Sequence, residues 1–335
     1  MAKHELVRPS RDGDQFHYHW AARQCLALLP GSGDLVAVSI EGPSTSERDT
    51  PTHEGDELVD VGLYYGSENF ADARLVHYVQ LKHSTRHAGE PWTASGLDRT
   101  LKGFASRYAK LLESGSASDL KKKVQFSFTT NRPIDSKVAE ALADLAKGCT
   151  PRHPALESLL LGYANLKGTA ANEFFSIFRA EGSEPGLWSQ RNLLSQDLSV
   201  FLTEADSDAP VQLKELVARK ATSESEKDPS IRRYDVLRAL KTSEEALLPA
   251  ECLITAPVRL LPREQETEIR QIIESSSQPV VLHADGGVGK SVLALRLAEA
   301  MPHGSVSVLY DCFGDGMYRN ALHFRHRYQI GRAHV

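Results

Sequence analysis

The stretch Leu75-Val76-His77-Tyr78-Val79-Gln80-Leu81-Lys82 decides the fold of the N-terminal half of the chain. Its β-branched, aromatic and aliphatic residues are typical of a buried strand. Gln80 and Lys82 are two positions apart, so a strand places both side chains on one face. The sequence therefore predicts a polar pair at the end of an otherwise apolar strand.

Two segments before this strand supply carboxylates. Residues 35–41 and 57–64 each read as a strand, and the second contains Asp60. Asp60 meets Gln80 and Lys82 if the second and third strands form a hairpin. Two-residue spacing is common by chance, and an exposed polar strand face is the simpler alternative. Asp60 and Lys82 nevertheless interrupt apolar strands, where an unpaired charge is costly, and this favours a functional pairing.

These residue types suit the metal-dependent hydrolysis of a phosphodiester. Carboxylates bind hard cations through oxygen, and the side-chain carbonyl of Gln80 is a further oxygen ligand. Lys82 can position the attacking water or stabilise the charge that develops on the phosphate. We predict that Asp60, Gln80 and Lys82 are catalytic. We also predict that Glu41, Asp60 and Gln80 bind Mg²⁺ or Mn²⁺.

Helical patterns surround these strands. Residues 15–29 predict an amphipathic helix, residues 97–112 a second helix, and residues 124–133 a further strand. The buried side of the first helix is expected to hold Phe16, Trp20, Cys25, Leu26, Leu28 and Leu29. Mostly helical patterns then occupy residues 151–250. The chain is thus expected to be an α/β protein with a helical middle segment.

A second motif follows the apolar residues 279–282 and reads Ala284-Asp285-Gly286-Gly287-Val288-Gly289-Lys290-Ser291. An apolar strand, a glycine-rich turn and a helical pattern over residues 292–298 predict a P-loop that binds a nucleotide. The phosphates would be bound by the backbone N–H groups of Gly286, Gly287, Val288 and Gly289.

In such a loop Lys290 reaches the β- and γ-phosphates, and the Ser291 hydroxyl binds Mg²⁺. Ala284 stands where the motif has its first glycine. The alternative is a glycine-rich turn that precedes a helix by coincidence. The second acidic residue of a nucleotide hydrolase is expected farther along the chain, so Asp311 is not assigned to it.

Composition bounds the remaining possibilities. The 335 residues are enough for two or more domains, and 41% hydrophobic with 25% charged residues is ordinary globular composition. No apolar run of about 18 residues or signal peptide is visible, so we expect a cytoplasmic protein without a membrane partner. Four cysteines without Cys-x-x-Cys spacing argue against zinc and disulfides. A net charge of −5 means that DNA binding must depend on local patches.

The last residues of the chain have an unusual sequence. Residues 329–335, Gln-Ile-Gly-Arg-Ala-His-Val, back-translate to the start of a common sequencing adapter. We therefore expect these residues to be an artefact at the end of a truncated fragment. A longer parent protein would carry the remainder of the nucleotide-binding domain.

The first half of the chain resembles the PD-(D/E)xK nuclease superfamily. The resemblance rests on the element order that contains Glu41, Asp60, Gln80-x-Lys82 and the strand at residues 128–133. It is strongest to the Gln-x-Lys endonuclease domain of CD-NTase-associated and related bacterial defence proteins. The resemblance implies a PD-(D/E)xK-like endonuclease domain at residues 10–150 and a helical extension at 151–250.

The block that contains the P-loop resembles STAND NTPases of the NACHT and AP-ATPase kind. Residues 310–319, followed by Arg325-His326-Arg327, resemble antiviral STAND (Avs-type) proteins. This implies the N-terminal part of a STAND NTPase domain at residues 251–328. It also implies a switch in which a missing C-terminal sensor binds a foreign phage protein. ATP would then drive homo-oligomerisation, and the clustered nuclease domains would cut double-stranded DNA.

Two other classes of protein remain open at the level of sequence. One is a nucleotide-binding signalling module whose inactive nuclease fold binds DNA or another protein without cutting. The other is an ATP-dependent restriction-type enzyme with a motor. His17 and His19 are interpreted as surface or packing residues, and His83 and Ser84 either line the nuclease cleft or lie outside it.

Overall fold

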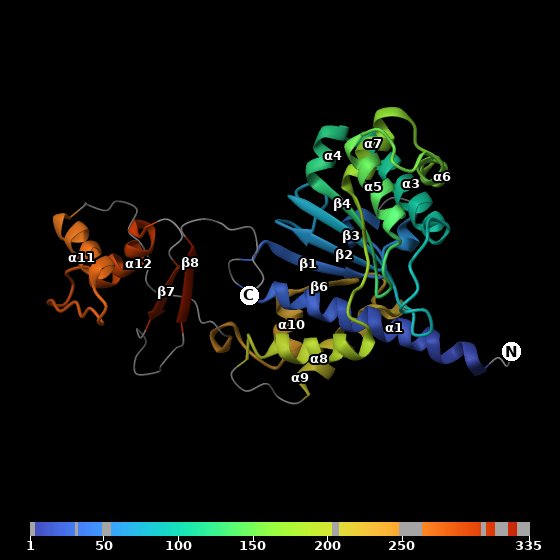
Figure 1. Cartoon of the computed structure of the whole chain (residues 1–335). Helices are drawn as coiled ribbons and strands as arrows, with labels where there is room; N and C mark the ends of the chain where they lie inside the picture. The colour runs from blue at the N-terminus through green and yellow to red at the C-terminus, as the bar shows by residue number, and fades with distance from the viewer. Residues whose placement is uncertain are drawn as a thin grey trace. The chain divides into compact units, whose positions relative to one another are not determined.

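A six-stranded mixed sheet forms the centre of the N-terminal part of the chain in the computed structural model (Figure 1). The strand order is β5-β4-β3-β2-β1-β6. Strands β1, β2 and β3 are antiparallel neighbours, β4 and β5 continue in parallel from β3, and β6 is antiparallel to β1. The strands are β1 (Leu35–Ile40), β2 (Val61–Tyr65), β3 (Leu75–Lys82), β4 (Val124–Thr130), β5 (Phe178–Glu181) and β6 (Ser230–Arg232). The expected α/β class is confirmed.

Helices cover both faces of this sheet (Figure 1). Helices α3 to α7 lie on one face, and α1, α8, α9 and α10 lie on the other. The bounds are α1 (His4–Cys25), α2 (Thr45–Arg48), α3 (Asp98–Ser114), α4 (Ala117–Lys123), α5 (Ser136–Lys147), α6 (Pro154–Ala164), α7 (Gly168–Ile177), α8 (Leu187–Leu198), α9 (Ala209–Lys220) and α10 (Arg233–Ala239). Covering both faces explains why the central strands are apolar on both sides.

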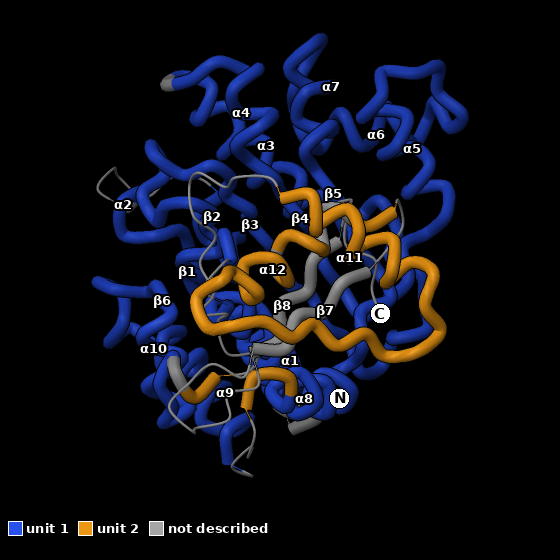
Figure 2. The backbone as a smooth tube through the Cα atoms, turned by 90° about the vertical axis from the view of Figure 1, so that its left-hand side faces the viewer, with its two compact units in different colours: residues 1–199, 204–244 blue, residues 200–203, 245–335 orange. Residues whose placement is uncertain are grey.

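The chain divides into two compact units (Figure 2). The first comprises Met1–Ser199 and Glu204–Glu244, and the second comprises Val200–Thr203 and Glu245–Val335. The structure describes residues 4–30, 33–48, 55–202, 208–247, 263–302, 306–311 and 321–326. The expected artefact at residues 329–335 lies outside them, as does most of the segment 310–319.

Several predicted elements are confirmed. Strand β3 has the expected bounds, α3 covers the helix expected at residues 97–112, and β4 covers most of 124–133. Helix α1 begins earlier than predicted and continues into a 3-10 turn at Leu26–Leu28. All six residues expected on its buried side are buried, namely Phe16, Trp20, Cys25, Leu26, Leu28 and Leu29. Amphipathic spacing therefore identified the packed face of α1 correctly.

The strand expected at residues 57–64 begins later than predicted. Asp56–Leu58 forms a 3-10 turn, η2, and β2 starts at Val61. Gly55 precedes the turn with φ +104°, and an added Cβ there would lie 2.4 Å from the carbonyl oxygen of Gly103 in α3. Residues 55–58 are thus packed against a helix, and their apolar members reflect that contact. Asp60 lies directly before β2.

The segment expected to be a helical extension also contributes strands to the sheet. Residues 151–199 and 204–244 are grouped with the first compact unit and supply both outer strands of its sheet, β5 and β6. Their side chains Phe178 and Ile231 are buried. Helices α8 and α9 pack on α1, and α7 packs on α5. Without β5 and β6, the backbone edges of β4 and β1 would lack partners.

The second unit contains α11 (Glu264–Ser275), α12 (Lys290–Ala300), β7 (Val306–Asp311) and β8 (Ala321–His326). Strands β7 and β8 are antiparallel partners. The strand expected at residues 279–282 is not formed, and Val281 is 87% exposed. A buried strand requires neighbours in a sheet, and the two strands described in this unit pair with each other. The prediction of a strand before the glycine-rich loop was therefore wrong for this structure.

Among the residues that the structure describes, no helix is long and apolar enough to cross a membrane.

We expect a fragment of residues 1–150 to lose cooperative unfolding, whereas residues 1–247 keep it. Ending at residue 150 removes β5, β6 and the buried aromatic side chains Phe174, Phe175 and Phe178. Loss of each buried aromatic costs about 3–5 kcal/mol, against a total stability of about 5–15 kcal/mol. Thermal unfolding followed by circular dichroism measures the difference. A sharp transition for residues 1–150 would contradict the proposed role of the outer strands.

Candidate metal site

The structure brings three possible metal ligands together at one end of the sheet. One ligand atom from each of His17, Glu41 and Asp60 lies within 4.8 Å of the others. Glu41 follows β1 and Asp60 precedes β2, so the antiparallel pairing of these strands makes them neighbours. The Glu41 N–H donates to the Asp60 carbonyl oxygen at 2.9 Å. His17 comes from α1, which packs on the same region.

The Asp60 carboxylate is fixed to the end of β3. The Leu81 N–H donates to Asp60 Oδ2 at 2.6 Å, and the Asp60 N–H donates to the Val79 carbonyl oxygen at 3.0 Å. Lys82 is the next residue of β3, and its positive charge acts on the carboxyl groups of Asp60 and Glu41. The structure therefore brings Asp60, Glu41 and Lys82 together, as the sequence pattern suggested.

Glu41 adopts an uncommon backbone conformation. Its φ is +52°, in the left-handed region, and Gly42 follows with φ +127°. The Ser39 hydroxyl donates to the Gly42 carbonyl oxygen at 2.7 Å. Left-handed backbone costs free energy at residues other than glycine and is found often at functional sites.

The electrostatics of the site favour protonated carboxyl groups and a neutral imidazole. The pKa of Glu41 is raised to about 7, chiefly by withdrawal from water and also by the negative charges of Asp60 and Asp14, while Lys82 opposes the shift. Burial raises the pKa of Asp60 to about 6, against the Leu81 N–H and Lys82. Burial and Lys82 lower the pKa of His17 to about 4. A bound divalent cation would lower the electrostatic free-energy cost of ionising two adjacent carboxyl groups.

Gln80 is engaged differently from our expectation. Its side chain is buried, and its Oε1 accepts a hydrogen bond from the Thr100 hydroxyl of α3. The Gln80 oxygen that we expected to bind the cation therefore accepts a hydrogen bond from α3 in this structure. This hydrogen bond links β3 to α3.

Sequence reasoning missed His17, which was interpreted as a surface or packing residue. Phe16 and Trp20 point into the core, and His17 flanks this stripe on α1. No sequence spacing connects residue 17 with residues 41 and 60. The three residues come together only because α1 packs on the sheet. His19 does have a packing role, since it is buried and its Nδ1 lies 2.7 Å from the Gln15 carbonyl oxygen.

His83 and Ser84 lie beside this site. The His83 ring stacks on Phe16 with centroids 4.8 Å apart. Burial lowers the pKa of His83, and the nearby His17 lowers it further. Within the described part of the chain, His83 Nδ1 is buried and has no hydrogen-bond partner. The Ser84 N–H donates to Asn131 Oδ1 at 2.8 Å.

The glycine-rich loop of the second unit leads into α12, as predicted. Lys290 is the first residue of the helix, and its Nζ donates to the carbonyl oxygens of Ala284 and Asp285, each at 2.7 Å. Gly287 and Gly289 have φ of +79° and +93°. A cavity of about 820 Å³ adjoins the loop and is lined by residues that include Arg263, Glu266, Asp285, Gly287, Lys290 and Arg296.

Comparisons with known proteins add a distant structural likeness. No protein-family model matches the chain, and a search of curated proteins found no match. The solved Cap4 SAVED/CARF-domain containing receptor of Moraxella osloensis is 14% identical with a TM-score of 0.40, over 74% of this chain and 52% of that chain. The Acinetobacter baumannii Cap4 receptor with the cyclic trinucleotide 3'3'3'-cAAA is 12% identical with a TM-score of 0.37, over 68% and 46%. The chain spans about half the length of these structures.

We expect the affinity for Mn²⁺ to rise with pH, by about tenfold per pH unit for each carboxyl proton that binding displaces. The pKa values of Glu41 and Asp60, about 7 and about 6, place this rise between about pH 5 and pH 7.5. His17 has a pKa of about 4 and stays neutral over that range. Titration of Mn²⁺ followed by electron paramagnetic resonance measures the affinity.

The pH dependence of stability in the metal-free protein is a control for the titration of these two carboxyl groups. Both carboxyl groups bind protons more tightly in the folded state than in the unfolded chain. Their contribution to stability is therefore present at about pH 4 and is lost as the pH rises to about 7. Asp60→Asn should flatten this dependence in thermal unfolding with EDTA. An affinity for Mn²⁺ that does not change from pH 5.5 to 7.5 would contradict the assignment.

Proposed function

We propose that the first unit is a metal-dependent nuclease that hydrolyses phosphodiester bonds in double-stranded DNA. The observation that supports it is the meeting of His17, Glu41 and Asp60 beside Lys82. Carboxylates that hold a cation next to a lysine suit phosphodiester hydrolysis. The choice of DNA comes from the resemblance to Gln-x-Lys endonucleases.

The donor set favours Mn²⁺ over Mg²⁺. Mg²⁺ prefers a shell of oxygen ligands, whereas imidazole nitrogen suits transition metals. Two carboxylates and the neutral His17 imidazole therefore fit Mn²⁺ well. The cation would polarise the phosphate and lower the pKa of a bound water.

The other residues act around this centre. Lys82 is exposed at the end of β3, where its ammonium group can stabilise the charge on the phosphate. The Leu81 N–H holds the Asp60 carboxylate in one orientation. Gln80 positions the end of β3 through its hydrogen bond with Thr100.

We further propose that the second unit binds ATP and switches the nuclease on through oligomerisation in bacterial antiviral defence. The cavity beside Lys290 and the helix N-terminus supports nucleotide binding. Lys290 now donates to carbonyl oxygens of its own loop, which a phosphate can replace as acceptor. The switch and the defence role follow from the resemblance to STAND proteins.

Lys82→Ala should lower the rate of Mn²⁺-dependent DNA cleavage by at least about 100-fold, because it removes the charge that stabilises the phosphate. Asp60→Asn should abolish cleavage, because it removes a ligand. Nicking of a supercoiled plasmid measures the rate. Lys147→Ala is the matched control, since Lys147 is an exposed lysine in the last turn of α5. Wild-type cleavage by folded Lys82→Ala would reject the proposal.

Lys290→Ala should weaken ATP binding by about tenfold or more, because it removes the cation expected at the β- and γ-phosphates. Equilibrium binding of a fluorescent ATP analogue measures this. Arg270→Ala is the control within the same unit, since Arg270 pairs with Glu274 on α11 and does not line the cavity. Equal affinities in the wild type and Lys290→Ala would show that the loop is not a nucleotide site.

A further inference from the structure

One segment of the chain carries both candidate carboxylate ligands at its ends. It connects β1 to β2, beginning with Glu41 and finishing with Asp60. The precision of the site therefore depends on how this segment is held. Two described parts of the segment, α2 and η2, carry the acidic residues Glu47 and Asp56.

A single buried arginine of α3 joins these two parts. Arg107 Nη2 donates to Glu47 Oε2 at 2.5 Å, and Arg107 Nη1 donates to Asp56 Oδ1. The Arg107 side chain is 5% exposed, and those of Glu47 and Asp56 are 8% and 12% exposed. The guanidinium also lies 4.3 Å from the centre of the Tyr78 ring.

The groups around this bridge require an arginine at position 107. Glu47 accepts hydrogen bonds from the Tyr64 hydroxyl and, at 2.6 Å, from the Tyr78 hydroxyl. Arg107 thus lies between two largely buried carboxylates, and one of them, Glu47, also accepts hydrogen bonds from two phenols. Removing a buried cation from such a cluster is costly, because both carboxylates lose a counter-charge that they share. A lysine retains the charge but lacks the planar fork that reaches two carboxylates.

The contact between α3 and η2 also restrains the backbone that leads to Asp60. Gly55 packs against Gly103, which lies one helical turn before Arg107. The chain then runs through η2 to Asp60 within a few residues, and the Asp60 N–H bonds to β3. Fixing Asp56 therefore fixes the path into the metal site.

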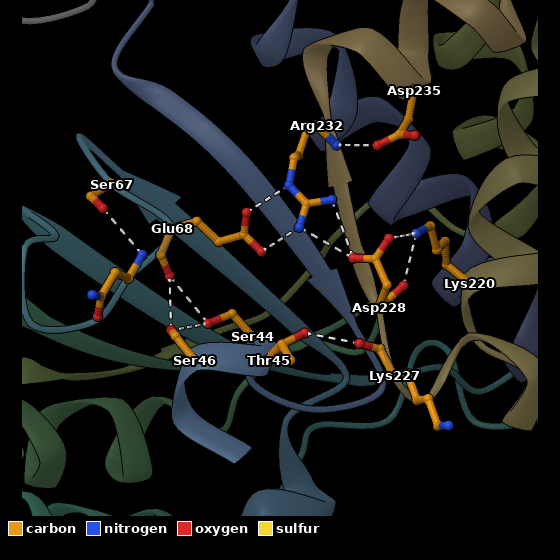
Figure 3. Close-up of polar contacts among 11 residues, drawn as sticks. Ser44, Thr45, Ser46, Ser67, Glu68, Lys220, Lys227, Asp228, Arg232 and Asp235 are labelled. Atoms are coloured by element: carbon orange, nitrogen blue, oxygen red, sulfur yellow. Dashed lines mark hydrogen bonds and ion pairs between the residues drawn. The ribbon is translucent and has the colours of Figure 1, made fainter. Parts of the chain in front are cut away.

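The earlier part of the segment has a second set of contacts (Figure 3). The hydroxyls of Ser44 and Ser46 donate to the Glu68 carbonyl oxygen at 3.2 and 3.3 Å. Arg232 of β6 holds the Glu68 carboxylate, with Nε 2.7 Å from Oε2. This network remains when Arg107 is changed, so residues 55–61 are expected to loosen more than residues 41–48.

We infer that Arg107 is a positioning residue for the metal site, acting by bridging Glu47 and Asp56 from the helix side of the sheet. The inference rests on the proposed function for the identity of the site. The side-chain contacts of Arg107 described here are with Glu47, Asp56 and Tyr78, and none of these is a candidate cation ligand. The pairing of β1 with β2 brings Glu41 and Asp60 together, and Arg107 restrains the segment that runs between them.

Hydrogen exchange tests the bridge without any metal. In the full chain, Arg107→Lys should raise the exchange rate of peptides covering residues 55–61 by about tenfold or more. Arg152→Lys is the control, because Arg152 bridges Asp144 and Glu140 near α5, outside the segment between β1 and β2. Exchange in that segment should be unchanged in the control. Unchanged exchange in Arg107→Lys would overturn the inference.

Mn²⁺ affinity then tests the link to the site. Changes in groups that orient metal ligands cost about 10–100-fold in affinity, and we expect a loss of this size in folded Arg107→Lys. If that variant does not fold, Glu47→Gln replaces it with the same expected direction. Wild-type affinity in a variant with a loosened segment would overturn the positioning role. A wild type that binds Mn²⁺ without cutting DNA would refute the proposed function and leave this inference intact.

Discussion

The antiparallel register of β1, β2 and β3 is the constraint on which the candidate site depends. Ile40 lies opposite Val61, and Val61 lies opposite Val79. The end of β1, the start of β2 and the last residues of β3 therefore meet at one end of the sheet. Glu41 and Asp60 lie directly beyond these pairs. A shift of one residue would turn the polar side chains to the other face, so the apolar residues that fix the register also fix the chemistry.

Acidic residues within the connection from β1 to β2 have two different electrostatic environments. Glu47 and Asp56 have a buried guanidinium between them. Glu41 and Asp60 have Lys82 nearby, but their pKa values are still raised. Because Arg107 is a permanent buried counter-ion for Glu47 and Asp56, we assign the first pair a structural role. In the second pair the charged forms of the carboxyl groups are disfavoured, and perturbed carboxyl groups of this kind are typical of functional sites.

Local sequence patterns predicted the elements whose partners are close in the chain. Strand β3 and the buried stripe of α1 were confirmed because periodicity reports directly on burial. His17 and Arg107 were missed because their roles arise from packing between distant segments. Strands β5 and β6 are short, with four and three residues, and helical patterns on either side obscured them. The strand expected at residues 279–282 failed because a strand depends on its neighbours as well as on its own residues.

The two candidate sites differ in what ligand binding has to change. In the first unit, strand register and the Leu81 N–H already hold the Asp60 carboxylate, so a cation mainly displaces protons. In the second unit, Lys290 must release the carbonyl oxygens of Ala284 and Asp285 before it can bind phosphate. Phosphate is the stronger acceptor because it is charged. Nucleotide binding is therefore expected to rearrange the loop, whereas metal binding leaves the backbone in place, and the loop is the better suited of the two to act as a switch.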